Sequence, residues 1–206
     1  MSKRWVLSPP NKGLQAEISS KLKVSPLLAQ ILINRGITDV TSAKNFLNPQ
    51  MNLLGDPSSL PDIDKASFRI NEAIKNGENI VIYGDYDVDG LTATALMYRC
   101  LELVGAKVAY YIPERLEEGY GLNADAIIRL KKGGAKVILT VDCGINACHE
   151  AEVARDCGID LIITDHHQPG KETPRAFAVV NPKLKIAENG FKDFSGVGIA
   201  FKLAWA

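Results

Sequence analysis

The stretch Asn79-Ile-Val-Ile-Tyr-Gly-Asp-Tyr-Asp-Val-Asp-Gly90 joins a short apolar run to three carboxylates at every second position. The apolar run is typical of a buried β-strand, and the acidic segment is typical of a loop that follows such a strand. Two carboxylates about 4 Å apart repel by roughly 4 kcal/mol at an effective dielectric of about 20. If Asp85, Asp87 and Asp89 converge, they therefore need a positively charged partner, and a divalent cation is the simplest one.

The calcium loop of an EF-hand begins with a similar pattern. Asp85, Asp87, Asp89 and Gly90 match its positions 1, 3, 5 and 6, but position 12 is Leu96 instead of a bidentate Glu. The residues before the acidic segment also resemble a strand instead of an entering helix. We therefore reject this kind of calcium site. A simple polar turn, with Asp89 near a helix N-cap, stays open as the alternative to a metal site.

The rest of the chain repeats the change from apolar run to helical segment. We expect strands at residues 79–83, 108–112, 137–141, 161–164 and 177–180, and helices at residues 64–76, 91–104, 123–132 and 146–157. Strands that alternate with helices predict an α/β fold: a Rossmann-like parallel sheet flanked by helices. Residues 1–60 lack strand-like alternation, and short helices at 14–22, 26–34 and 41–47 predict a small helical N-terminal region before a main domain at 61–206.

Polar side chains follow several of the predicted strands directly. Asp142 comes after one strand, Asp165, His166 and His167 after the next, and Asn181 after the last. Ligands of such sheets bind outside the carboxyl ends of the strands, where these residues meet. A single Asp in this place is usually a helix cap, but acids and imidazoles after separate strands together predict a metal site.

Composition limits the classes of protein that the chain can belong to. It has 206 residues, 46% of them hydrophobic, and Lys plus Arg equals Asp plus Glu at 24 each, so no global basic field marks it as a nucleic-acid-binding module. We find neither a signal peptide nor an apolar run long enough to span a membrane, and we expect a cytoplasmic protein without membrane contact. The four cysteines lack a Cys-x-x-Cys pair, so we expect reduced thiols and not a zinc cluster with His149.

Three motifs, in this order, carry a resemblance to a known family: Gly84-Asp-Tyr-Asp-Val-Asp-Gly90, Val141-Asp-Cys-Gly144 and Thr164-Asp-His-His167. With them the chain resembles the DHH phosphoesterase superfamily, and within it the bacterial exonucleases that are specific for single-stranded DNA. Shorter pieces from Lys3-Arg-Trp5 to Ser195-Gly-Val-Gly198 are similar too, so the resemblance covers nearly the whole chain.

The resemblance implies a hydrolase with two Mn²⁺ or Mg²⁺ ions. Matched position by position, the metal ligands are Asp87, Asp89, Asp142 and His166, with Asp142 as the bridge. Asp85 is an acid beside the metals, which we count among both the ligands and the catalytic residues. His167 is expected to face the substrate phosphate. Arg115, which we also count among the catalytic residues, and the loop at 119–121 match a region that lines the nucleic-acid path.

The implied activity is 5′-to-3′ exonuclease digestion of single-stranded DNA in DNA repair and recombination. The resemblance also implies a single-strand-binding protein and a helicase as partners. We expect the full-length protein to be a monomer. Two alternatives stay open. One is a DHH hydrolase of short oligonucleotides, cyclic dinucleotides or pyrophosphate, and the other is an inactive scaffold fragment.

The sequence also departs from the family pattern. Tyr83 stands where many phosphatase members have a His, so the first metal is expected to rely on acids and water. The chain stops at Ala206, before a further Asp ligand and a second domain of the family, and we expect a domain truncated at its C-terminal end. Ser195-Gly-Val-Gly198 lacks the Lys of a P-loop and is interpreted as a turn that opens a helix.

Overall fold

The computed structural model describes residue 6 and residues 8–114, 121–184 and 193–206. It divides the chain into two compact units, Met1–Gly55 and Asp56–Ala206, and we describe each by itself. In the described part, no helix is both long enough and apolar enough to cross a membrane.

The first unit is helical, as its sequence predicts. It contains α1 (Lys12–Leu22), α2 (Pro26–Asn34), α3 (Val40–Leu47) and the 3₁₀ turn η1 (Met51–Leu53). Side chains of Asn11, Ser25 and Asp39 accept hydrogen bonds from backbone N–H groups in the first turns of α1, α2 and α3, which explains where these helices begin. Their buried faces form a small core of Ile18, Ala29, Leu32 and Ala43.

The second unit is a five-stranded sheet with helices. Its elements are η2 (Pro57–Ser59), α4 (Ile63–Lys75), β1 (Asn79–Gly84), α5 (Val88–Leu103), β2 (Lys107–Tyr111), α7 (Ala124–Lys132), β3 (Val137–Val141), α8 (Cys148–Asp156), β4 (Asp160–Thr164), β5 (Ala178–Val180) and α9 (Gly196–Trp205). The strand order is β2-β1-β3-β4-β5 and all four pairings are parallel. The predicted α/β fold is therefore confirmed.

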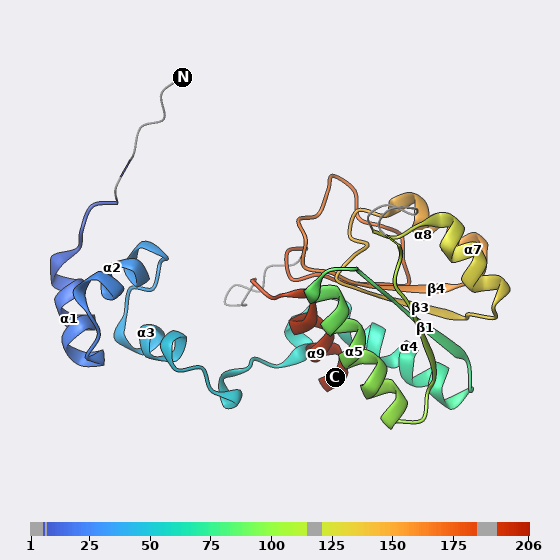
Figure 1. Cartoon of the computed structure of the whole chain (residues 1–206), viewed down its shortest axis with the longest axis horizontal. Helices are drawn as coiled ribbons and strands as arrows, with labels where there is room; N and C mark the ends of the chain where they lie inside the picture. Colours follow the sequence, from blue (N-terminus) through green and yellow to red (C-terminus); the bar gives the residue numbers. More distant parts are fainter. Residues whose placement is uncertain (1–5, 7, 115–120, 185–192) are drawn as a thin grey trace, which may run out of the picture. The chain divides into compact units, whose positions relative to one another are not determined.

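Side chains of the sheet alternate between two cores. Ile80 and Ile82 of β1 pack with α4, α5 and α9, whereas Val81 and Tyr83 pack with α7 and α8. Figure 1 shows the same division, with α7 and α8 on one face of the sheet and α4, α5 and α9 on the other. Burial on both faces explains why the strands are almost continuously apolar.

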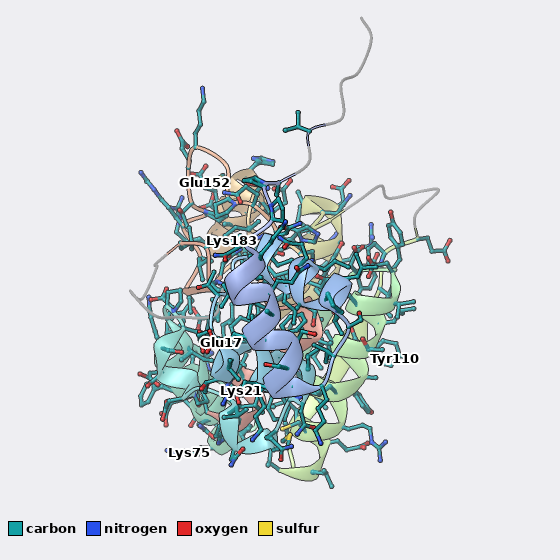
Figure 2. The ribbon with its side chains drawn as sticks, turned by 90° about the vertical axis from the view of Figure 1, so that its left-hand side faces the viewer. Glu17, Lys21, Lys75, Tyr110, Glu152 and Lys183 are labelled. Atoms are coloured by element: carbon teal, nitrogen blue, oxygen red, sulfur yellow. The ribbon has the colours of Figure 1, made fainter. Side chains whose placement is uncertain are left out.

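Strand order changes direction between β1 and β3. The chain goes from β1 outward to β2, and then returns to add β3, β4 and β5 on the other side of β1. At such a switch point the loops after the two central strands diverge and leave a crevice for ligands. β2 is an edge strand, and its Tyr110, labelled in Figure 2, is 61% exposed and lies edge-on to Tyr98 of α5.

The helix after the acidic segment begins earlier than the sequence suggested. We expected it to start at residue 91, but α5 starts at Val88, because the Asp87 side chain accepts a hydrogen bond from Gly90 N at 3.0 Å and caps the helix. Asp89 therefore lies in the first helical turn and not in a loop. The Asp that we associated with the N-cap was the wrong one of the three.

A close approach between β1 and α5 sets the position of the acidic segment. A Cβ atom on Gly84 would overlap Thr94 Oγ1, which is buried and has no hydrogen-bond partner among the described residues. Only glycine leaves room for α5 at this point of the strand.

We expect Gly84→Ala to lower the free energy of unfolding by about 1 to 3 kcal/mol, because the added methyl group overpacks the contact. Urea unfolding followed by circular dichroism measures the change. Gly55→Ala is the matched control, since a Cβ there meets no atom within 4 Å. If Thr94→Ala in the Gly84→Ala background restores none of the lost stability, the overlap with Thr94 is not the cause.

Candidate metal centre

The carboxyl edge of the sheet gathers the predicted polar residues. Asp85 and Asp87 follow β1, Asp142 follows β3, and the segment 165–167 follows β4. β1, β3 and β4 are adjacent in the sheet, so their ends deliver these side chains to one place. The polar residues that follow these strands thus lie close together at one edge of the sheet, as expected from the sequence.

Two groups of ligand atoms can be defined in this cluster. The first contains Asp85, Asp87 and Asp142, and the second contains Asp142, His166 and His167; within each group, one ligand atom per residue lies within 4.8 Å of the others. Asp142 belongs to both groups. One carboxylate shared by two adjacent groups of ligand atoms is an arrangement that can serve two neighbouring cations.

Asp142 combines deep burial with a left-handed backbone conformation. It is 1% exposed and adopts a positive φ of 64°, which short polar residues tolerate better than most. Its N–H donates to Thr164 O at 3.0 Å, which fixes the backbone. Burial, as the largest cause, and the nearby carboxylates, led by Asp89 and Asp87, together raise the pKa of its carboxyl to about 8.

The oxygen Oδ1 of Asp142 has no hydrogen bond in the described part of the chain. His166 Nε2 is 3.1 Å away, but the two groups are not aligned as a hydrogen bond. A buried carboxylate oxygen without a donor is costly, and a cation would remove the cost. The donor set, carboxylates with imidazole, therefore fits divalent metal ions.

Asp89 lies beside the cluster, but α9 holds it. Its two oxygens accept hydrogen bonds from Gly196 N at 2.7 Å and Val197 N at 2.8 Å, and His166 Nε2 lies 3.7 Å from Oδ2. The N-terminus of α9 thus places its partial positive charge on this carboxylate. Asp89 belongs to neither of the two ligand groups.

Asp85 is also buried, with 1% exposure. Burial raises the pKa of its carboxyl, although the hydrogen bond that Oδ1 accepts from Tyr86 N at 2.8 Å lowers it. Glycines make this crowding sterically feasible. A Cβ on Gly90 would lie 2.5 Å from Asp85 O, and a Cβ on Gly196 would overlap the Asp142 carboxylate.

Asp165 anchors the loop that carries both histidines. Its Oδ2 accepts a hydrogen bond from Ile145 N at 2.9 Å, and its Oδ1 accepts one from His167 N at 3.0 Å and lies 2.7 Å from His167 Nδ1. An ionised carboxylate only accepts, so this contact is a hydrogen bond in the form of His167 that carries a proton on Nδ1. Asn181 donates to His167 O at 3.0 Å and holds the same loop from β5.

Sequence reasoning placed Asp165 and Asn181 at this edge but assigned them no part in orienting His167. It gave no hint of the contacts between α9 and the acids. Arg115 and residues 119–120 lie outside the described residues, so their predicted place along a nucleic-acid path is not described. None of the metal-ligating groups in the described part contains a cysteine.

The fold agrees with comparisons to known proteins. A family model described as DHH family, N-terminal domain, matches residues 79–206. The single-stranded-DNA-specific exonuclease RecJ of Bacillus subtilis (strain 168) is 43% identical over 203 residues, which is 98% of this chain and 26% of that protein. RecJ of Escherichia coli (strain K12) is 34% identical, covering 89% of this chain and 31% of that protein.

A crystal structure of RecJ from Thermus thermophilus in complex with Mn²⁺ superposes with a TM-score of 0.74 at 34% identity, covering 97% of this chain and 27% of that one. The chain thus spans about a quarter to a third of the length of these relatives.

The raised pKa of Asp142 predicts how stability depends on pH without metal. The folded chain keeps a proton on Asp142 that the unfolded chain loses near pH 4, so the free energy of unfolding should fall as pH rises from about 4 to about 8. Asp142→Asn mimics the protonated acid; it should remove much of this fall and exceed wild type by at least about 1 kcal/mol at about pH 9.

Urea unfolding in the presence of a chelator measures both effects. Asp156→Asn serves as the control, because this carboxylate is 75% exposed on α8 and should leave the pH dependence unchanged. A wild-type free energy of unfolding that is flat over this window would contradict the assignment.

Proposed function

We propose that this chain, which belongs to the DHH family, is the metal-binding part of an exonuclease that hydrolyses phosphodiester bonds of single-stranded DNA. Membership rests on the family model over residues 79–206. The observation that carries the proposal is the shared position of Asp142 between two groups of ligand atoms. The substrate class is proposed from the RecJ relatives, which are named single-stranded-DNA-specific exonucleases.

The residues present fit two divalent cations. Asp85 and Asp87 would face one position, His166 would face the other, and Asp142 would bridge them. Asp89 can contribute from the side of α9, since its oxygens keep lone pairs beyond the two backbone hydrogen bonds. When bound, two cations polarise the phosphoryl group and neutralise the leaving oxygen, so no side-chain nucleophile is required.

His167 is proposed to contact the substrate phosphate. Asp165 holds its Nδ1, so the opposite ring nitrogen, Nε2, is the one that can contact a nonbridging oxygen. With both ring nitrogens protonated, Nε2–H would donate to that oxygen and stabilise the charge that grows in the transition state. Asp85 would act beside the metals through its negative charge.

Carboxylates with imidazole ligands favour manganese, and magnesium is the second candidate. The solved RecJ structures include complexes with Mn²⁺ and with Mg²⁺. We extend the proposal to 5′-to-3′ direction, to a role in DNA repair and recombination in the cytoplasm, and to a single-strand-binding protein and a helicase as partners of a monomeric full-length protein. These extensions rest on the family resemblance.

Metal binding offers the first test. Mn²⁺ at a hundredfold excess over its dissociation constant should raise the free energy of unfolding by about 2.7 kcal/mol for each ion that binds. Asp142→Ala should abolish binding at both positions together, as measured by calorimetric titration, whereas Asp156→Ala should bind as wild type does. An unchanged number of bound ions in Asp142→Ala would refute the bridging role.

Substrate preference offers the second test. With Mn²⁺, the protein should release mononucleotides from single strands much faster than from duplex DNA, and a block at the 5′ end should stop the release. His167→Ala should lower kcat by about 10² to 10³-fold without changing the number of bound ions.

Three other results would each count against the proposal. Faster turnover of dinucleotides, cyclic dinucleotides or pyrophosphate would favour a different DHH hydrolase. Bound metal without hydrolysis of any of these substrates would favour a scaffold. Release that a 3′ block stops, but a 5′ block does not, would reverse the proposed direction.

A further inference from the structure

A cavity of about 250 Å³ opens at the carboxyl ends of β3 and β4, where α8 begins. Leu122, Ile145 and Ala147 form its apolar wall, and Asn146, Glu150 and His167 contribute the polar groups. At about 30 Å³ per water molecule, this is the space of roughly eight waters. It lies below the range of about 300–1,000 Å³ that drug-sized ligands occupy, so the cavity suits one small ring system with a sugar.

The cavity is contiguous with the metal centre. His167 lines it, and the same side chain belongs to the group with Asp142 and His166 whose ligand atoms lie within 4.8 Å of one another. A phosphate held at the centre would therefore lie one side chain away from the cavity. An enzyme that removes single nucleotides from a strand end benefits from a binding space next to its metals, because the terminal nucleotide must be bound and positioned before the bond is hydrolysed.

Most polar groups in the wall already have partners within the chain. Asn146 Oδ1 accepts from Gly170 N at 2.7 Å and its Nδ2 donates to Gln168 O at 3.3 Å, while Asp165 is occupied by Ile145 and His167. These bonds make the wall a preformed surface. They also leave few groups that could recognise a ligand.

Glu150 is the exception. It is half-buried in the first turn of α8, where the helix dipole favours a negative charge. No hydrogen bond or ion pair joins its carboxylate to another described residue. A carboxylate only accepts hydrogen bonds, so its ligand must present N–H or O–H donors.

We propose that this cavity receives the terminal nucleoside of the substrate strand, with the base against Leu122 and Ala147 and its N–H donors on Glu150. The inference rests on the proposed function, since it states where the end of that substrate strand would bind. Guanine offers two adjacent N–H donors to a carboxylate, whereas thymine offers one N–H between two carbonyl groups that the carboxylate repels. The cavity should therefore bind deoxyguanosine more tightly than thymidine.

Titration of the metal-free chain with deoxyguanosine, followed by ¹H–¹⁵N correlation spectra, tests the site directly. The nucleoside carries no phosphate, so it cannot bind through the metal centre. We expect shifts at Ile145, Asn146, Ala147 and Glu150, and weaker binding of thymidine. Glu150→Gln should weaken deoxyguanosine binding about ten-fold, which corresponds to one good hydrogen-bonded base contact, and Ala147→Leu should abolish binding by filling the cavity.

Glu152→Gln is the matched control, because Glu152 lies on the same helix, is exposed and is labelled in Figure 2. This variant should bind deoxyguanosine as wild type does. Circular dichroism checks that each variant is folded, and Glu150→Gln keeps the test decisive if Ala147→Leu fails to fold. Shifts elsewhere, or affinity unchanged in Glu150→Gln, would overturn the proposal.

The experiment also separates this inference from the proposed function. Nucleoside binding requires neither metal nor hydrolysis, so a protein that binds deoxyguanosine at Glu150 but does not cut single strands would refute only the function. A protein that cuts single strands but shows no nucleoside binding in the cavity would refute only the inference.

Discussion

The accumulation of negative charge around Asp142 is the constraint on which the metal centre depends. This residue is almost fully buried, and Asp89, Asp87, Asp165 and Asp85 all raise its pKa. A carboxylate in such surroundings is stable when it is protonated or when cations are bound. The fold does not relieve the repulsion with Lys or Arg, since no described salt bridge involves these acids except through His166 and His167. The crowding is therefore suited to a pair of divalent ions.

Tight backbone packing maintains the crowding. α5 approaches β1 at Gly84, its own first turn approaches Asp85 at Gly90, and α9 approaches Asp142 at Gly196. At the same time α9 donates two N–H groups to Asp89, a residue 107 positions earlier than Gly196. The last described helix thus contacts the acids directly, and its N-terminus places a favourable dipole beside them.

The centre and the adjacent cavity share one supporting network. Asp165 ties the turn after β3 to the loop after β4 through Ile145 and His167, and Asn181 holds that loop from β5. Because His167 faces both the ligand cluster and the cavity, the same bonds that orient it would align a phosphate with the nucleoside attached to it.

The sequence by itself determined the alternation of strands and helices, the apolar strands and the acids and imidazoles that follow them, because these depend on local periodicity and residue type. Only the tertiary structure decided that Asp142 belongs to both ligand groups, that α9 holds Asp89 and that Asp165 orients His167. These relations join residues far apart in the chain. Their distances follow from the order β2-β1-β3-β4-β5 and from helix packing, which no local pattern specifies. The start of α5 was misjudged for a related reason: three nearby Asp residues could each cap a helix, and the packing of the turn selected Asp87.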